Sequence, residues 1–137
     1  MTTAEIHLDI YTDGGARGNP GPSGIGAVIK REGKVIGSYG EFIGTATNNQ
    51  AEYRAVLLGI QKAKQHDGTH LHFYLDSELV ASQLRREYKV KDAELAKLFV
   101  QIWNLTHDFK RLEFSWIPRE QNYEADAMVN QAIDRAL

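Results

Sequence analysis

The sequence predicts an α/β protein whose sheet begins antiparallel and continues parallel. In the first third, three stretches of largely alternating apolar residues indicate consecutive half-buried strands, at 5–13, 25–29 and 35–43. From residue 48 onward, short apolar strands alternate with segments whose apolar residues recur at helical spacing. Strands that follow one another directly favour an antiparallel meander, whereas strands separated by helices favour parallel pairing.

A glycine-rich run separates the first two expected strands. Residues 14–24 hold five of the twelve glycines and two of the three prolines. Glycine costs backbone entropy in a strand and proline removes a hydrogen-bond donor, so we expect this run to form a loop. Asp13 would then lie at the carboxyl end of the first strand.

The remaining elements follow from the change of period. We expect helices at 48–66, from Ser77 to about Leu84, at 93–107 and at 124–137, with strands at 71–75 and 112–116 between them. Asn48 is expected to cap the first helix. The length suits one hydrophobic core and no linker interrupts the chain, so we expect a single domain over residues 1–137.

Composition excludes several classes of protein. Without cysteine, neither a disulfide nor a thiolate metal site can form. No signal-peptide pattern or long apolar run occurs, so we expect a soluble, cytoplasmic protein with no membrane association. The net charge of −2 argues against a general nucleic-acid binder, but subtracting four acids neutralised by cations changes −2 to +2.

Four carboxylates are candidates for a common site. Asp13 and Asp76 each follow an expected strand, and ligands in open α/β sheets bind beyond the carboxyl ends of parallel strands. Glu52 and Asp126 are each expected in the first turn of a helix, from which they could join the first two. Neighbouring carboxylates repel one another and persist most easily as ligands of hard divalent cations such as Mg²⁺. A pair of such ions about 3.5–4 Å apart suits in-line phosphoryl displacement.

Each acid also has a purely structural explanation. Asp13 could be a turn residue, and Asp76 could mark a helix entry. Glu52 could be a charge favoured by the helix dipole, and Asp126 could belong to a solvated helix face. Only convergence of the four side chains distinguishes the explanations, and spacing in the sequence does not establish convergence.

Four motifs, in order, resemble the type 1 ribonuclease H family. They are Tyr11-Thr12-Asp13-Gly14 with Gly18-Asn19-Pro20-Gly21-Pro22, then Thr47-Asn48-Asn49-Gln50-Ala51-Glu52, Leu75-Asp76-Ser77 and Glu124-Ala125-Asp126. The resemblance covers nearly the whole chain. It implies the ribonuclease H-like fold, with a five-stranded mixed sheet of three antiparallel strands followed by parallel strands, flanked by helices. It also implies an endoribonuclease that hydrolyses the RNA strand of RNA/DNA hybrids, leaving 5′-phosphate and 3′-hydroxyl ends.

The resemblance further assigns residues. It implies that Asp13, Glu52, Asp76 and Asp126 are catalytic and bind two Mg²⁺ ions, with Mn²⁺ as an alternative. It implies contacts with the hybrid from Gly14, Gly18, Asn19, Thr47, Asn48 and Asn49. Backbone groups and short amides can reach 2′-hydroxyls in the shallow minor groove of an RNA-like duplex. Without the resemblance, turn and cap chemistry would explain Gly18, Asn19 and Asn48.

Two features depart from the family pattern. Many members carry a histidine in the loop before the last aspartate, whereas here residues 118–123 contain none, so Arg119 and Glu120 are candidates for an auxiliary role. The basic helical handle of some bacterial members is also missing. Hybrid affinity should therefore be lower and more dependent on Mg²⁺, unless a group of basic residues forms a smaller cationic edge. The alternative is that these residues are only a solvated run of surface charges. Those residues are Arg85, Arg86, Lys89 and Lys91.

Two other functions remain open. One is a nuclease of the same fold with wider specificity, acting on double-stranded RNA or on RNA–DNA junctions. The other is a non-catalytic domain that binds hybrids, against which the presence of all four carboxylates argues. No obligate protein partner is evident.

Overall fold

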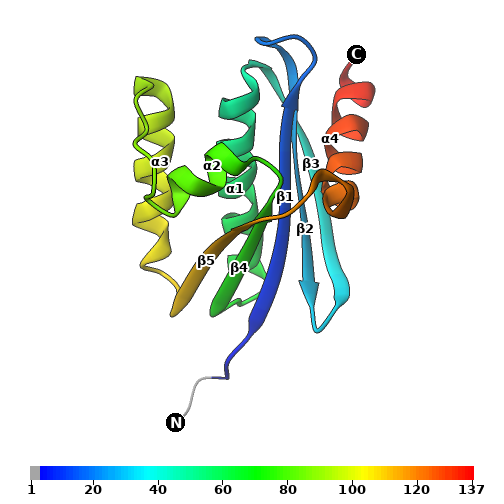
Figure 1. The fold of residues 1–137 in the computed structure, drawn as a ribbon. Coiled ribbons are helices and arrows are strands. Elements are labelled where there is room, and N and C mark those ends of the chain that lie inside the picture. The colour runs from blue at the N-terminus through cyan, green and yellow to red at the C-terminus, as the bar shows by residue number, and fades with distance from the viewer. Residues whose placement is uncertain (1–3) are drawn as a thin grey trace.

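A computed structural model, which describes residues 4–137, places five strands in one mixed sheet of order β3-β2-β1-β4-β5. The strands are β1 (His7–Ala16), β2 (Gly21–Arg31), β3 (Lys34–Ala46), β4 (His70–Leu75) and β5 (Arg111–Trp116) (Figure 1). β1, β2 and β3 pair antiparallel, whereas β4 pairs in parallel with both β1 and β5. The predicted sheet, antiparallel first and then parallel, is confirmed.

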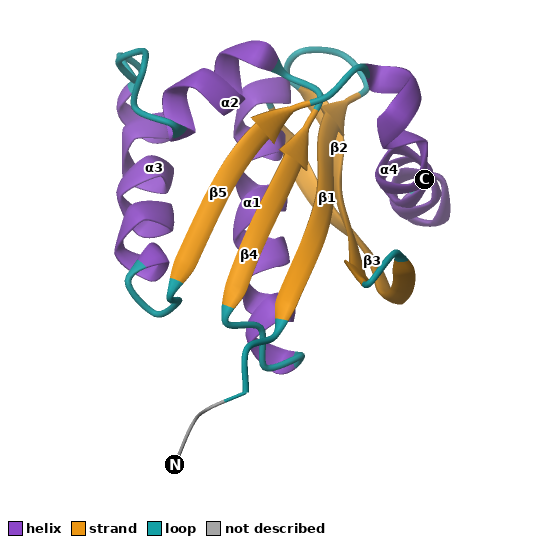
Figure 2. Cartoon of the chain, turned by 60° about the horizontal axis from the view of Figure 1, so that its bottom comes forward, coloured by secondary structure: helices purple, strands orange, loops and turns teal. Residues whose placement is uncertain are grey.

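Helices cover both faces of the sheet. They are α1 (Asn48–Gln65), α2 (Glu78–Leu84), α3 (Ala93–Thr106) and α4 (Tyr123–Ala136), with a 3₁₀ turn η1 (Arg119–Asn122) before α4. α1, α2 and α3 lie on one face, and α4 crosses the other face over β1, β2 and β3 (Figure 2). The β4 and β5 part of that second face carries no helix among the described residues. In residues 4–137, no helix combines the length and apolar character needed to cross a bilayer.

The main core lies between the sheet and α1. Leu8 and Ile10 of β1 and Phe73 of β4 pack with Tyr53 and Ile60 of α1, and none of these five side chains is more than 2% exposed. The alternation along β1 and β4 therefore points the apolar side chains toward α1. This packing fixes the positions of β1, which carries Asp13, and of β4, which Asp76 follows.

The prediction that residues 14–24 form a loop was wrong. β1 continues to Ala16 and β2 begins at Gly21, so the connection contains only four residues. Two glycines of β2 allow α4 to approach the sheet closely: a Cβ on Gly24 would lie 2.8 Å from the Val129 carbonyl oxygen of α4. A Cβ on Gly26 would lie 2.6 Å from the Ala125 carbonyl oxygen. Helix packing therefore overrides the low strand propensity of glycine.

The start of α1 also differs from the prediction. Thr47, not Asn48, is the N-cap: its hydroxyl accepts from the Gln50 N–H at 3.1 Å, and the Gln50 side chain accepts from the Thr47 N–H at 2.9 Å. This reciprocal arrangement is a capping box, which satisfies two helix-end donors at once. The prediction that Glu52 lies in the first turn of this helix was therefore wrong, because Glu52 lies beyond that turn. Asp126 does lie in the first turn of α4, as predicted.

Candidate active site

Three carboxylates meet where the β1–β4 ladder ends. The last pair of that parallel ladder is Tyr11 with Tyr74, so Asp13 and Asp76 each follow two residues later on adjacent strands. Glu52 approaches the same point from α1. One carboxylate oxygen from each of the three acids lies within 4.8 Å of the other two. The structure therefore brings together three of the four acids that the sequence singled out.

Gly14 allows Glu52 to reach Asp13. A Cβ on Gly14 would lie 2.5 Å from the Glu52 backbone nitrogen and closer still to the Ala51 carbonyl group. The backbone of α1 therefore lies directly against β1 at this point. Glu52 is 7% exposed, and its Oε2 is buried without a hydrogen-bond partner in residues 4–137.

The three carboxyl groups hold their protons more tightly than usual. Burial, followed by the charge of Asp76, raises the pKa of Asp13 to about 8. Burial and the charge of Asp13 raise the pKa of Glu52. Burial also raises the pKa of Asp76, although a hydrogen bond from Asn122 and the charge of Arg119 oppose the increase. A buried carboxylate oxygen without a partner, in a cluster with excess negative charge, suits a hard divalent cation.

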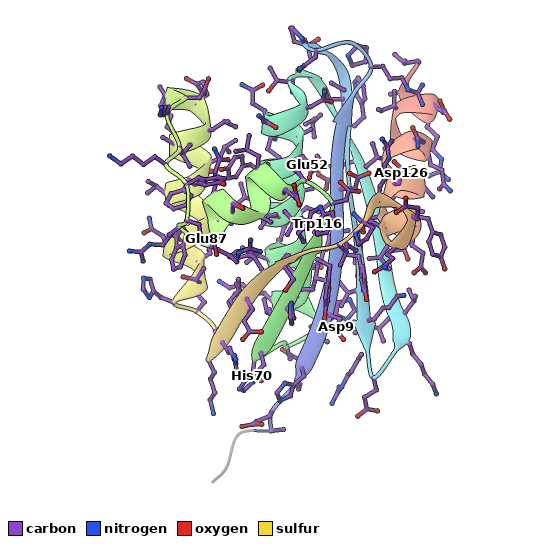
Figure 3. All side chains as sticks on the ribbon, in the orientation of Figure 1. Asp9, Glu52, His70, Glu87, Trp116 and Asp126 are labelled. Atoms are coloured by element: carbon purple, nitrogen blue, oxygen red, sulfur yellow. The ribbon has the colours of Figure 1, made fainter. Side chains whose placement is uncertain are left out.

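Asp126 lies in the same cavity but outside the three-acid group. The cavity has a volume of about 380 Å³, and Asp126 lines it together with Asp13, Glu52 and Asp76. The charge of Asp126 contributes to the raised pKa of Asp13. Figure 3 shows Glu52 and Asp126 on either side of β1 in the same part of the molecule. All four predicted acids therefore face one cavity.

Comparison with known proteins identifies the family. A family model described as reverse transcriptase-like matches residues 11–132. The ribonuclease H of Verminephrobacter eiseniae is 30% identical over 146 aligned residues, which cover 95% of this chain and 92% of that protein. The chain belongs to the type 1 ribonuclease H family.

Other relatives align over nearly all of this ribonuclease H chain. The bifunctional protein Rv2228c of Mycobacterium tuberculosis is 42% identical over 93% of the chain, which spans only 35% of that relative's length. The ribonuclease HI of Halobacterium salinarum is 36% identical over 92% of the chain and 64% of its own length. Members of the ribonuclease H family use divalent metal ions.

Solved structures of the family superpose closely. The N-terminal ribonuclease H domain of Rv2228c has a TM-score of 0.92 at 40% identity, covering 96% of both chains. LC11-RNase H1 in complex with an RNA/DNA hybrid has a TM-score of 0.89 at 42% identity, covering 94% of this chain and 98% of that one. The ribonuclease H-like fold expected from the sequence is confirmed.

One residue that supports the ribonuclease H site was not predicted. Asn122 is 1% exposed, and its side-chain amide donates to the Thr12 carbonyl oxygen at 2.9 Å and to Asp76 Oδ2 at 3.1 Å. Trp116 Nε1 donates to the Asp76 carbonyl oxygen at 3.3 Å. The sequence carries no signal for the Asn122 contact, because an asparagine just before a helix is usually a cap.

Two of the predicted substrate residues join the β1–β2 connection to α1. Asn48 Oδ1 accepts from the Ala16 N–H at 2.8 Å, and Asn19 Oδ1 accepts from the Asn48 N–H at 3.0 Å. Gly18 lies in the same connection with a φ of +89°, which favours glycine. Of the six predicted substrate residues, Gly14 and Asn48 line the cavity. The other four lie outside its lining: Gly18, Asn19, Thr47 and Asn49.

The loop without histidine offers an arginine instead. Arg119 lines the cavity, with its guanidinium 3.7 Å from Asp126 Oδ1 and its side chain 81% exposed. Glu120 is exposed on the same turn and does not line the cavity. Farther along the surface, Arg85 pairs with Glu87 at 3.0 Å and Arg86 packs over the Trp103 ring. These contacts favour a solvated charge run over a free cationic edge at Arg85 and Arg86.

Proposed function

We propose that residues 1–137 form a single catalytic domain, a metal-dependent endoribonuclease that hydrolyses the RNA strand of RNA/DNA hybrids. The products would carry 5′-phosphate and 3′-hydroxyl ends. The observation that carries the proposal is the convergence of Asp13, Glu52 and Asp76, with Asp126, in one cavity. Membership of the ribonuclease H family and the likeness to LC11-RNase H1, whose structure holds an RNA/DNA hybrid, support the substrate class.

The proposed cofactor is Mg²⁺, two ions per site, with Mn²⁺ as the alternative. Asp13, Glu52 and Asp76 would hold one ion, and Asp126 would complete a second position opposite Glu52. When bound, a pair of such ions supplies an activated water and stabilises the leaving oxygen of the scissile phosphodiester. Oxygen-only ligation by carboxylates is the donor set that Mg²⁺ prefers.

The carboxylates and their supports have distinct tasks in this proposal. Asp13 is shared by the whole cluster, because Asp76, Asp126 and Glu52 all contribute to the shift of its pKa. Asn122 keeps Asp76 oriented through its hydrogen bond to Oδ2. Glu52 has one free buried oxygen with which to bind an ion or to orient the attacking water. Arg119 is placed to attract a phosphate oxygen at the exposed rim of the cavity.

Recognition of RNA is assigned to the edge formed by the β1–β2 connection and the start of α1. The side-chain oxygens of Asn19 and Asn48 accept hydrogen bonds within the protein, so their side-chain nitrogens remain to donate to 2′-hydroxyls. Gly14 and Gly18 would let the backbone approach the groove, and Asn49 would add a second amide. Thr47 would form one wall of a pocket for a phosphate of the DNA strand.

Cleavage of four matched duplexes, with Mg²⁺ titrated from zero, tests this function. The substrates are an RNA/DNA hybrid, double-stranded RNA, double-stranded DNA and a duplex with one RNA–DNA junction. We expect metal-dependent cutting of the hybrid, abolished in Asp13→Asn and retained in the exposed control Asp67→Asn. Equal cutting of hybrid and double-stranded RNA would indicate the wider specificity, and hybrid binding without any cutting would indicate a non-catalytic domain.

A further inference from the structure

A second group of potential metal ligands lies at the opposite end of the sheet. His7 begins β1 and His70 begins β4, and the two are partners in the parallel ladder. Their imidazole rings stack with centroids 4.3 Å apart. Figure 3 shows His70 at the end of the sheet remote from Glu52 and Asp126. At a rise of about 3.3 Å per strand residue, His7 lies roughly 20 Å from Asp13.

Glu5 provides a third ligand atom. His7 Nε2 lies 3.3 Å from Glu5 Oε2, and one ligand atom from each of Glu5, His7 and His70 lies within 4.8 Å of the other two. Tetrahedral zinc, with bonds of about 2.0–2.2 Å to nitrogen and oxygen, places neighbouring ligand atoms about 3.4 Å apart. The Glu5–His7 spacing already matches. Rotation of exposed side chains can bring in His70, since the side chains of His7 and Glu5 are 66% and 60% exposed.

The neighbouring threonine fixes which nitrogen of His70 is free. The Thr69 hydroxyl donates to the Ile6 carbonyl oxygen at 3.2 Å and accepts from the Ile6 N–H at 2.8 Å. Thr69 Oγ1 also lies 2.8 Å from His70 Nδ1, so Nδ1 is engaged by the protein and Nε2 is the ring nitrogen left to bind a ligand. A cation bound at His70 Nε2 selects the tautomer in which Nδ1 carries the proton and donates to the Thr69 hydroxyl. Metal sites hold ligand histidines by this kind of hydrogen bond on the other ring nitrogen.

His72, the next histidine along β4, already has partners within the protein. His72 Nε2 lies 2.7 Å from Ser115 Oγ, and His72 Nδ1 lies 3.4 Å from Glu113, which also pairs with Arg111. The His72 ring stacks on Tyr74 with centroids 4.4 Å apart. The group of Glu5, His7 and His70 is therefore distinct from this neighbouring network.

We propose that Glu5, His7 and His70 bind a divalent transition-metal cation of the zinc class. Two imidazoles and one carboxylate leave a fourth position for water and favour Zn²⁺, Ni²⁺ or Cu²⁺ over Mg²⁺, which prefers oxygen ligands alone. The bound ion would connect β1 to β4, the strands that position Asp13 and Asp76. It stabilises the folded chain, because the three ligands are brought together only by folding. The site lies outside the proposed hydrolytic machinery and does not depend on it.

Zinc binding to the full chain tests the proposal. The measurement is a titration with ZnCl₂ alone, in excess Mg²⁺ so that the carboxylate cluster is occupied, read by calorimetry and by the thermal unfolding midpoint. We expect a rise in the midpoint on zinc binding, and His7→Gln and His70→Gln should each weaken zinc affinity at least about tenfold. His107→Gln, an exposed histidine at the end of α3, is the matched control and should bind like the unaltered chain.

Copper distinguishes this site from the carboxylates. Electron paramagnetic resonance of the Cu²⁺-loaded chain should show hyperfine coupling to two imidazole nitrogens, and each histidine variant should lose one. Thr69→Val should weaken zinc binding and Thr69→Ser should preserve it, because only serine retains the hydroxyl. Unchanged zinc affinity in both histidine variants, or copper with oxygen ligands alone, would overturn the proposal. Hybrid cleavage with Mg²⁺ is measured separately, without zinc. A chain that failed to cleave hybrids could therefore still bind zinc at Glu5, His7 and His70.

Discussion

At the scale of single residues, Asn122 connects three segments that meet at the carboxylates. Its amide donates both to the Thr12 carbonyl oxygen of β1 and to Asp76 Oδ2 after β4, from the turn that precedes α4. It does not line the cavity, so we regard it as a positioning residue that acts through Asp76. Its near-complete burial means that no water can replace either hydrogen bond without rearrangement.

Asn122→Ala should therefore affect both stability and metal use. Loss of two buried hydrogen bonds should lower the free energy of unfolding by about 1–3 kcal/mol, measured with urea. A mispositioned Asp76 should also raise the Mg²⁺ concentration needed for half-maximal hybrid cleavage. Asn104→Ala, on the exposed surface of α3, is the control. An unchanged Mg²⁺ requirement would reduce Asn122 to a structural role.

Arg119 is expected to assist catalysis from the rim. Its side chain is 81% exposed and its guanidinium lies 3.7 Å from Asp126, so Arg119→Ala should leave stability unchanged. Hybrid turnover should fall about tenfold, because a cation that attracts the substrate phosphate is lost. Glu120→Ala, on the same turn but away from the cavity, is the comparison. Full activity in Arg119→Ala with a loss in Glu120→Ala would transfer the auxiliary role to Glu120.

At the scale of elements, the position of α1 depends on Gly14 of β1 and not on the adjacent Gly15. Gly14 lies against the α1 backbone, whereas a Cβ on Gly15 would meet only a Val129 methyl group at 3.8 Å, an ordinary contact. Both residues have the same intrinsic backbone flexibility, but a Cβ on each would point to opposite faces of the sheet. The pair therefore separates the effect of helix approach from the effect of glycine flexibility.

Gly14→Ala should displace α1, whereas Gly15→Ala should not. Overpacking at Gly14 should lower the free energy of unfolding by about 1–3 kcal/mol and should move Glu52 away from Asp13, with loss of hybrid cleavage. Gly15→Ala should keep near-normal stability and activity. Urea unfolding and cleavage rates for the two variants provide the measurement. Equal behaviour of the two variants would show that close approach of α1 is not what Gly14 provides.

The elements could be predicted where the determinant is local. Alternation along β1 and β4 and helical spacing in α1 and α3 report which face is buried, and that pattern is written in neighbouring residues. Gly24 was misinterpreted as part of a loop because its partners, in α4, lie about a hundred residues away in the sequence. The strand-end rule found Asp76, which follows β4, and Asp13, which lies beyond the end of the β1–β4 ladder although β1 itself continues to Ala16. It could not find Asn122, whose role depends on three separate segments meeting.

At the scale of the whole molecule, the folded chain places four acids around one cavity. The sequence as a whole is nearly balanced, with a net charge of −2, so the repulsion is concentrated rather than spread over the surface. Without metal, folding forces buried carboxyl groups to remain protonated or to repel one another. Stability should therefore depend on both pH and divalent cations.

The direction of the pH dependence follows from the raised pKa of Asp13. Its value of about 8 in the folded chain exceeds its ordinary value of 3.8, so the folded chain binds a proton more tightly than the unfolded chain. The resulting stability is fully present below about pH 4 and is lost as pH rises through 8. Glu52, whose pKa is also raised, acts in the same direction. Metal-free protein should therefore lose stability between pH 5 and pH 8.

Asp13→Asn should remove most of this loss, since its amide does not ionise. At pH 8 without metal, the variant should exceed the unaltered chain by roughly 1–3 kcal/mol in urea unfolding, and at pH 5 the difference should shrink. Millimolar Mg²⁺ should stabilise the unaltered chain more than the variant at pH 8, because the ion binds the ionised cluster only in the folded state. Asp67→Asn, an exposed acid, should follow the unaltered chain throughout. Parallel pH curves for the unaltered chain and Asp13→Asn would show that the cluster is not the source of the dependence.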